Sequence, residues 1–134
     1  MNAKEYFIDT SGFYALLDAK DPDHATANDF FSKITSDLLF TTNYIFDETM
    51  ALVRIKLGYQ YAIKLGTEIK AGACELLSLE TKIEEEAWNL FIKRKDKNYS
   101  FTDCTSFVFC KTRKIKNVLS FDRHFIQEGF IIFH

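Results

Sequence analysis

The chain has 134 residues, a length that suits one domain able to bury roughly two-thirds of its unfolded surface. Its formal net charge of −2 excludes a protein held on nucleic acid by overall positive charge, but not an acidic enzyme that acts on a phosphodiester. No apolar run approaches the roughly 18 residues that span a bilayer, and the first residues carry no secretory segment, so we expect a cytoplasmic protein without a membrane segment.

Five short apolar runs are predicted to be strands, because runs without clean alternation are typical of strands covered on both faces. They are residues 6–9, 38–41, 74–79, 117–121 and 129–133. Apolar stripes with a helical period lie between them. The predicted helices include residues 43–57 and 101–114 and the stripes Ala27/Phe30/Phe31/Ile34, Ala62/Leu65/Ile69 and Ile83/Ala87/Leu90/Phe91. This alternation predicts an α/β fold with a mostly parallel sheet between layers of helices.

Proline and glycine mark two of the predicted helix ends. Pro22 is predicted at the first position of the second helix, and Gly58 directly after the end of one helix and before the next. No repeat or linker interrupts the pattern, so residues 1–134 are expected to form a single domain.

Four acidic residues stand where a predicted strand ends or a predicted helix begins. Asp9 closes the first strand, and Asp122 follows the fourth. Glu48 and Asp103 fall in the first turns of two predicted helices. In an open α/β sheet these places face one crevice, so we expect the four carboxylates to meet there.

Asp9 and Asp122 also have purely structural interpretations. Asp9 suits a helix N-cap, although Thr10 and Ser11 can cap in its place and a charge on a buried strand demands a partner. Asp122 suits a surface turn with Arg123 as its ion-pair partner. Taken alone, Asp122 favours the structural interpretation.

Glu48 and Asp103 have structural alternatives as well. An acid near a helix start is stabilised by the helix dipole, but Glu48 shares a face with Leu52 and Ile55 and heads an apolar stripe. Ser100 and Asp103 have the spacing of a capping box, while Asp103 also projects over the buried face of its helix.

Considered together, the four acids predict a metal site. Two carboxylates ~5 Å apart repel by roughly 3 kcal/mol at an effective dielectric constant of ~20, so four of them either raise their pKa values or capture a divalent cation. An all-oxygen site suits Mg²⁺ or Mn²⁺ and not zinc. The three cysteines form no paired motif that indicates zinc or a disulfide framework.

The ordered set of acids resembles the PIN domain family, specifically its VapC-like ribonuclease toxins. Residues 8–11 (Ile-Asp-Thr-Ser) match the first motif of that family, and Glu48 stands where the family carries a helix acid. Residues 100–104 resemble the third acidic motif and residues 120–125 the fourth. The resemblance covers nearly the whole chain.

The resemblance implies a three-layer α/β/α sandwich whose central sheet has about five strands. It also implies Mg²⁺- or Mn²⁺-dependent cleavage of an RNA substrate, a homodimer and a cognate antitoxin protein as partner. The expected catalytic and metal-binding residues are Asp9, Glu48, Asp103 and Asp122. One or two ions held by the three aspartates, with Glu48 as a ligand or as the base that orients water, are expected to support in-line attack that leaves a 5′-phosphate.

Other polar residues have weaker assignments. Thr10, Ser11 and Thr102 are expected to support the site by hydrogen bonding to its carboxylates or to a phosphate, with simple helix capping as the alternative. A basic run before the Asp103 helix is a candidate RNA contact, although lysines near the end of a helix are also favoured there by the dipole. The run is Lys93, Arg94, Lys95 and Lys97.

A second function class stays open at this point. A PIN-like module that binds RNA or a protein partner without cleaving has the same fold, but it has no need of all four acids. Metal titration separates the two, because a module that only binds takes up no Mn²⁺.

Overall fold

The computed structural model describes residues 3–134 and confirms the predicted alternation of strands and helices. The strands are β1 (Tyr6–Ile8), β2 (Leu39–Thr42), β3 (Glu75–Leu77), β4 (Asn117–Leu119) and β5 (Ile131–Ile132). The helices are α1 (Thr10–Leu17), α2 (His24–Lys33), α3 (Asn43–Lys56), α4 (Tyr59–Glu68), α5 (Thr81–Lys93), α6 (Phe101–Arg113) and α7 (Arg123–Gln127), with short turns η1 (Ser36–Leu38) and η2 (Ile69–Ala73). Within the described part, no helix combines the length and the apolarity that crossing a membrane requires.

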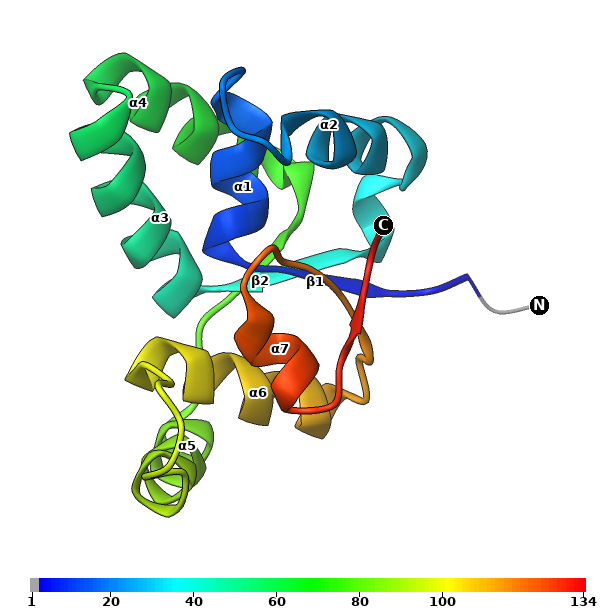
Figure 1. Cartoon of the computed structure of the whole chain (residues 1–134). Coiled ribbons are helices and arrows are strands. Elements are labelled where there is room, and N and C mark those ends of the chain that lie inside the picture. Colours follow the sequence, from blue (N-terminus) through cyan, green and yellow to red (C-terminus); the bar gives the residue numbers. More distant parts are fainter. Residues whose placement is uncertain (1–2) are drawn as a thin grey trace.

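The five strands form one parallel sheet in the order β3-β2-β1-β4-β5. Helices α1 to α4 cover one face, and α5, α6 and α7 lie on the other, which gives three layers (Figure 1). The chain moves outward from β1 to β3 and then returns to place β4 on the other side of β1. Strand order therefore reverses between β1 and β4, the place where open α/β sheets bind ligands.

A phenylalanine-rich core holds α6 and α7 under the sheet. The fully buried Phe125 ring lies 5.0 Å from Phe107 of α6 and 6.1 Å from Phe7 of β1, measured between ring centroids. Aromatic pairs at such distances add roughly 0.5–1.5 kcal/mol each to their burial. This packing fixes the N-termini of α6 and α7, next to which Asp103 and Asp122 stand.

Gly12 allows α1 to approach the end of β4 closely. A Cβ atom at this position would lie 2.8 Å from the backbone oxygen of Leu119, closer than such atoms approach in proteins. The backbone N–H of Asp9 donates to the same oxygen at 3.0 Å. The start of α1 is thereby held against the carboxyl end of β4, which brings Asp9 beside Ser120.

Two local predictions had different outcomes, and one helix was not predicted. Gly58 follows α3 with a φ of 112°, as the prediction for this glycine required. Pro22 is not the first residue of a helix, because α2 begins at His24. The side chain of Asp21 accepts from the backbone of Asp23 at 2.8 Å and fixes a turn around the proline instead. The five-residue α7 lies where only a surface turn was expected.

Candidate active site

The structure brings the four predicted acids into one open pocket of about 430 Å³. Asp9 follows β1, Asp122 follows β4, and Glu48 and Asp103 come from α3 and α6. The pocket thus lies at the carboxyl ends of β1 and β4, where the strand order reverses. Its other lining residues are Thr10, Ser11, Leu52, Asn98, Ser100 and His124.

Asp9 is the most buried of the four acids, with 5% of the residue exposed. It occupies the N-cap position of α1, but its side chain makes no capping hydrogen bond. One oxygen, Oδ2, accepts from the hydroxyls of Ser11 and Ser120, each at 3.0 Å. The capping interpretation of this side chain is therefore wrong, and the carboxylate faces the pocket.

The surroundings of Asp9 oppose its negative charge. Burial raises its pKa to about 7, and the negative charges of Asp103 and Glu48 act in the same direction. The hydrogen bonds from Ser120 and Ser11 only partly offset these effects. Among the described residues, no lysine or arginine forms an ion pair with any of the four acids.

Glu48 stands in the second turn of α3 and keeps part of its side chain exposed. Its Oε1 accepts a hydrogen bond of 2.5 Å from Thr10, whose hydroxyl in turn accepts from Thr49 at 3.0 Å. Desolvation at the pocket wall raises the pKa of Glu48, and the charges of nearby aspartates raise it further. Leu52 lines the pocket, but Ile55 is 83% exposed, so the apolar stripe predicted from Glu48 through Ile55 is wrong at its end.

Asp103 takes part in a capping box and faces the pocket as well. Its Oδ2 accepts from the backbone N–H of Ser100 at 3.0 Å, and its own N–H donates to the Ser100 hydroxyl at 3.0 Å. The same Oδ2 lies 2.8 Å from Nδ1 of His124. The capping spacing in the sequence was thus a correct indication, but capping engages only one of the two carboxylate oxygens.

Asp122 is the N-cap of α7. Its Oδ1 accepts from the backbone N–H of His124 at 3.0 Å, and its own N–H donates to Ser120 at 3.1 Å. Arg123 is exposed, and among the described residues it makes no ion pair with Asp122. The surface-turn interpretation with Arg123 as partner is therefore wrong.

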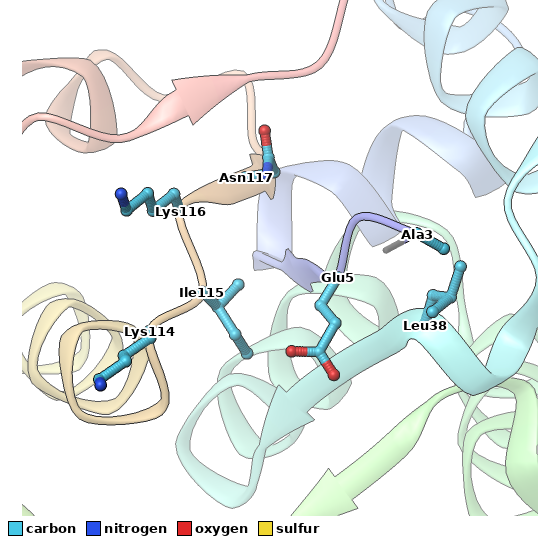
Figure 2. Close-up of a pocket in the computed structure, with 7 residues that line it drawn as sticks. All are labelled: Ala3, Glu5, Leu38, Lys114, Ile115, Lys116 and Asn117. Atoms are coloured by element: carbon cyan, nitrogen blue, oxygen red, sulfur yellow. The ribbon is translucent and has the colours of Figure 1, made fainter. Parts of the chain in front are cut away.

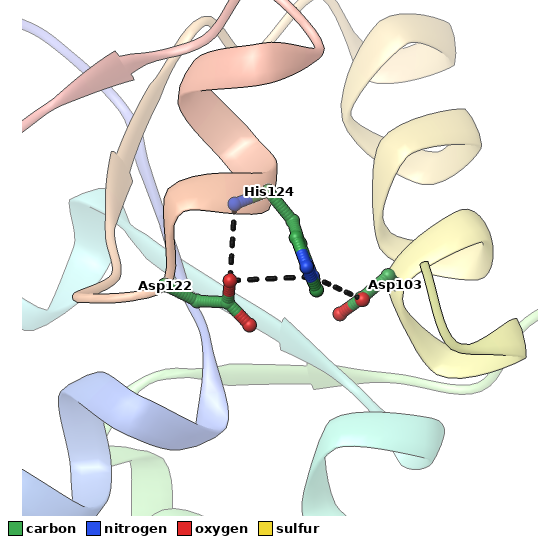
Figure 3. Close-up of side chains that lie close together, drawn as sticks. All are labelled: Asp103, Asp122 and His124. Atoms are coloured by element: carbon green, nitrogen blue, oxygen red, sulfur yellow. Dashed lines mark hydrogen bonds and ion pairs between the residues drawn. The ribbon is translucent and has the colours of Figure 1, made fainter. Parts of the chain in front are cut away.

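His124 also belongs to the cluster, although the sequence pattern did not predict this histidine as a site residue. Its Nδ1 lies 2.8 Å from Asp103 and 3.2 Å from Asp122 (Figure 3). One ligand-type atom from each of these three residues lies within 4.8 Å of the others. The spacing of two residues between Asp122 and His124 at a helix start was the available signal, but the contact with Asp103 depends on the tertiary fold.

The four carboxylates share one property that fits a hard divalent cation. Each has one oxygen held by the hydrogen bonds given above, and in residues 3–134 the other oxygen has no protein partner. The oxygens without a protein partner are Asp9 Oδ1, Glu48 Oε2, Asp103 Oδ1 and Asp122 Oδ2. Metal-ligating carboxylates are themselves hydrogen-bonded in this way, and Mg²⁺ takes oxygen ligands. The donor set therefore fits Mg²⁺ or Mn²⁺.

The supporting hydroxyls divide into two groups. Thr10 and Ser11 line the pocket and hydrogen-bond to Glu48 and Asp9 respectively. Thr102 precedes Asp103 but is not among the lining residues, and its carbonyl oxygen accepts from Thr105 at 2.6 Å. Only the first two hydroxyls therefore contact the acids.

The basic run at the end of α5 and directly after it leads toward the pocket. Lys93, Lys95 and Lys97 are exposed, whereas the guanidinium of Arg94 is bound to Glu128 at 3.1 Å. Asn98, which directly follows the run, lines the pocket. The three lysines are therefore free to meet a phosphate, and Arg94 is already engaged.

A larger pocket of about 550 Å³ lies at the opposite end of the sheet, before β1 and β4. Glu5 is the one carboxylate among its lining residues, and the side chains of Lys114 and Lys116 point away from it (Figure 2). This pocket has volume but no converging ligands. Volume alone therefore does not identify the functional site.

Comparison with known sequences gives one family. Residues 6–130 match the PIN domain family. A curated relative, the 23S rRNA-specific endonuclease VapC20 of Mycobacterium tuberculosis, is 29% identical over 125 residues, which cover 93% of this chain and 95% of the relative. Ribonuclease VapC26 of the same organism is 29% identical over 119 residues, which cover 88% of this chain and 87% of that relative.

Solved structures agree with the sequence relatives. The crystal structure of Mycobacterium tuberculosis VapC20, described as a sarcin-ricin loop cleaving toxin, superposes with a TM-score of 0.88 at 29% identity and covers 95% of this chain and 97% of that one. FitAcB from Neisseria gonorrhoeae gives a TM-score of 0.70 at 14% identity, with 96% of each chain covered. The latter likeness concerns the fold alone.

Proposed function

The chain belongs to the PIN domain family, and on this premise we propose that it is the endoribonuclease toxin of a toxin–antitoxin pair. It hydrolyses RNA phosphodiester bonds in the cytoplasm with Mg²⁺ or Mn²⁺. The observation that carries the proposal is the set of four converging carboxylates, each with one free oxygen and none with a lysine or arginine partner among residues 3–134. A cluster of four negative charges around the buried Asp9, with no lysine or arginine among the described residues to balance them, calls for an external cation.

The residues have distinct roles in this scheme. Asp9, Asp103 and Asp122 offer the free oxygens that hold the ion, while Thr10 keeps Glu48 at the pocket wall as a further ligand or as the base that orients water. The bound ion supplies activation of a water molecule and charge neutralisation at the phosphate in the transition state. In-line attack of water on the phosphorus would break its bond to the 3′-oxygen and leave a 5′-phosphate and a 3′-hydroxyl.

Ribosomal RNA is the first substrate class to test. The relative VapC20 carries 23S rRNA specificity in its name, and this chain covers almost all of that relative. The exposed Lys93, Lys95 and Lys97, in the segment that precedes the lining residue Asn98, supply positive charge for an RNA backbone. Contacts with the backbone give the affinity that does not depend on sequence. Loops suit such a pocket, because their bases and backbone are not enclosed in a duplex.

We also assign to this chain a cognate antitoxin and a homodimeric state. Several large apolar side chains on helices α3, α5 and α7 are exposed and are available for contact with such partners. They include Ile55 (83%), Trp88 (53%), Ile92 (58%) and Ile126 (59%). Light scattering of the chain alone and with its antitoxin tests both assignments.

The decisive assay is cleavage of a 23S rRNA fragment and of an unrelated RNA in Mg²⁺, in Mn²⁺ and in EDTA. We expect cleavage only with metal, 5′-phosphate ends, and no cleavage by Asp9→Asn. Asp37→Asn, an exposed aspartate far from the pocket in sequence, serves as the matched control and should cleave normally. Cleavage that survives both EDTA and Asp9→Asn contradicts the scheme, whereas RNA binding without cleavage in any metal supports the non-cleaving module.

A further inference from the structure

The imidazole of His124 connects two acids that come from separate elements. Its Nδ1 lies 2.8 Å from Oδ2 of Asp103 on α6 and 3.2 Å from Oδ1 of Asp122 at the start of α7. Figure 3 shows the ring between the two carboxylates, with one nitrogen directed at both. At this distance an imidazole N–H is the group that donates to a carboxylate oxygen.

The ring is also in contact with a buried tyrosine. The Tyr99 ring meets His124 edge to face at 5.3 Å between centroids, and its hydroxyl donates to Glu128 at 3.0 Å. Tyr99 is only 6% exposed, and 24% of the His124 side chain is exposed. The imidazole therefore contacts a packed aromatic ring as well as the two acids, and most of it is shielded from solvent.

The contacted oxygens are those that the protein already uses. Asp103 Oδ2 also accepts from Ser100, and Asp122 Oδ1 also accepts from the backbone of His124. The other oxygen of each carboxylate carries no contact in Figure 3. His124 thus contacts one oxygen of each carboxylate and leaves the other oxygen of each without a protein partner in the described chain.

We propose that His124 is a positioning residue of the metal site, which holds Asp103 and Asp122 so that their free oxygens bind one ion. This inference rests on the proposed function, since it assumes that the acids bind a divalent cation. Outer hydrogen-bond partners of metal ligands typically contribute 10- to 100-fold in metal affinity. The positioning role requires a donor at the place of Nδ1, not a histidine as such.

The test is Mn²⁺ binding to the full chain, followed by electron paramagnetic resonance, for wild type and two variants. His124→Phe keeps a ring against Tyr99 but removes the donor, and we expect its Mn²⁺ affinity to fall roughly 10- to 100-fold. His124→Asn places an amide N–H near the position of Nδ1 and should restore most of the affinity. His134→Phe, the same change at an exposed terminal histidine, is the control and should bind like wild type.

Three results would overturn the inference in distinguishable ways. A ¹⁴N coupling from histidine in the Mn²⁺ spectrum of wild type, with equal loss in both His124 variants, makes His124 a direct ligand. If folded His124→Phe binds Mn²⁺ as tightly as wild type does, His124 has no role toward the metal, although the metal site itself is then confirmed. Failure of folded wild type itself to bind Mn²⁺ removes the metal site and the proposed function with it.

Discussion

Two buried acids, Asp9 in the pocket and Glu128 after α7, have opposite environments in the same small domain. The Glu128 side chain is 4% exposed and is surrounded by donors. Arg94 binds it at 3.1 Å and Lys111 at 2.8 Å, and the hydroxyl of Tyr99 donates at 3.0 Å. Asp9 has two serine hydroxyls and no cation.

The two pKa values differ accordingly. Burial alone would raise the pKa of Glu128, but the hydrogen bonds from Arg94, Lys111 and Tyr99 outweigh it and lower the value to about 2. Burial and neighbouring negative charges raise the pKa of Asp9 to about 7. The chain therefore places its own cations beside the buried carboxylate of Glu128 and, within residues 3–134, places none beside Asp9, where we propose that a metal ion binds. Tyr99 joins the two regions, because it contacts both Glu128 and His124.

The largest effect is expected from removing charge in the pocket without disturbing a helix. Asp122→Asn keeps a good N-cap for α7 but removes a negative ligand. We expect RNA cleavage to fall by at least about 100-fold, equivalent to roughly 2.7 kcal/mol of transition-state stabilisation, with normal circular dichroism. Asp23→Asn, at the N-cap position of α2, is the control. Near-normal cleavage by Asp122→Asn would remove this acid from the reaction.

The next largest effect is a loss of stability expected from a change at Glu128, the buried acid that is paired with Arg94 and Lys111. Glu128→Gln should lower the free energy of unfolding at pH 7 by roughly 2 kcal/mol, because hydrogen bonds to a charged group are lost. The pKa of Glu128 is lowered in the folded state, so the ionised carboxylate stabilises that state. This stabilisation is complete above about pH 4.5 and disappears as the pH falls toward about 2. Urea unfolding at pH 7 and at pH 3 measures this difference, which should shrink at the lower pH. Metal-dependent cleavage should persist in the variant.

The contribution of Asp9 to stability should show the opposite pH dependence in metal-free protein. Because the folded-state pKa of Asp9 is raised to about 7, stability from this group falls as pH rises from about 4 to about 7. We expect the free energy of unfolding in EDTA to drop by roughly 2.6 kcal/mol between pH 5 and pH 8 on account of Asp9. Asp9→Asn should flatten this part of the profile. An unchanged profile in the variant would show that Asp9 carries no such penalty.

The smallest effect is expected at the rim. Reversing two exposed charges, Lys95→Glu with Lys97→Glu, should weaken RNA binding several-fold and reduce the slope of log affinity against log salt by about 1. Lys114→Glu with Lys116→Glu, at the opposite end of the sheet, is the matched pair and should leave the slope unchanged. If both pairs of substitutions reduce the salt slope equally, RNA binding depends on the overall charge of the protein and not on the position of these lysines.

The features of the fold and of the pocket that depend on local sequence pattern could be predicted from the sequence. Apolar runs indicated all five strands, and the rule for carboxyl ends of parallel strands brought Asp9 and Asp122 to one crevice. Capping chemistry correctly indicated the Ser100–Asp103 pair. These features follow from neighbours within a few residues or from general topology.

The parts that could not be predicted depend on tertiary contacts. Arg94 and Lys111 reach Glu128 across 34 and 17 residues, and nothing local in the sequence pairs them. His124 meets Asp103 across 21 residues for the same reason. Ile55 fits a buried helical stripe by period alone, yet it lies near the end of α3 where nothing in the described chain covers it.

The most direct measurement is the melting temperature of the full chain with and without Mn²⁺, for wild type, Asp9→Asn and Glu128→Gln. A cation at 100 times its dissociation constant stabilises the folded state by about 2.7 kcal/mol, so we expect wild type and Glu128→Gln to gain several degrees in Mn²⁺ and Asp9→Asn to gain little. In EDTA at pH 8, Asp9→Asn should melt above wild type and Glu128→Gln below it. An equal gain in Mn²⁺ for wild type and Asp9→Asn, or none for wild type, would contradict a pocket built to hold an external cation.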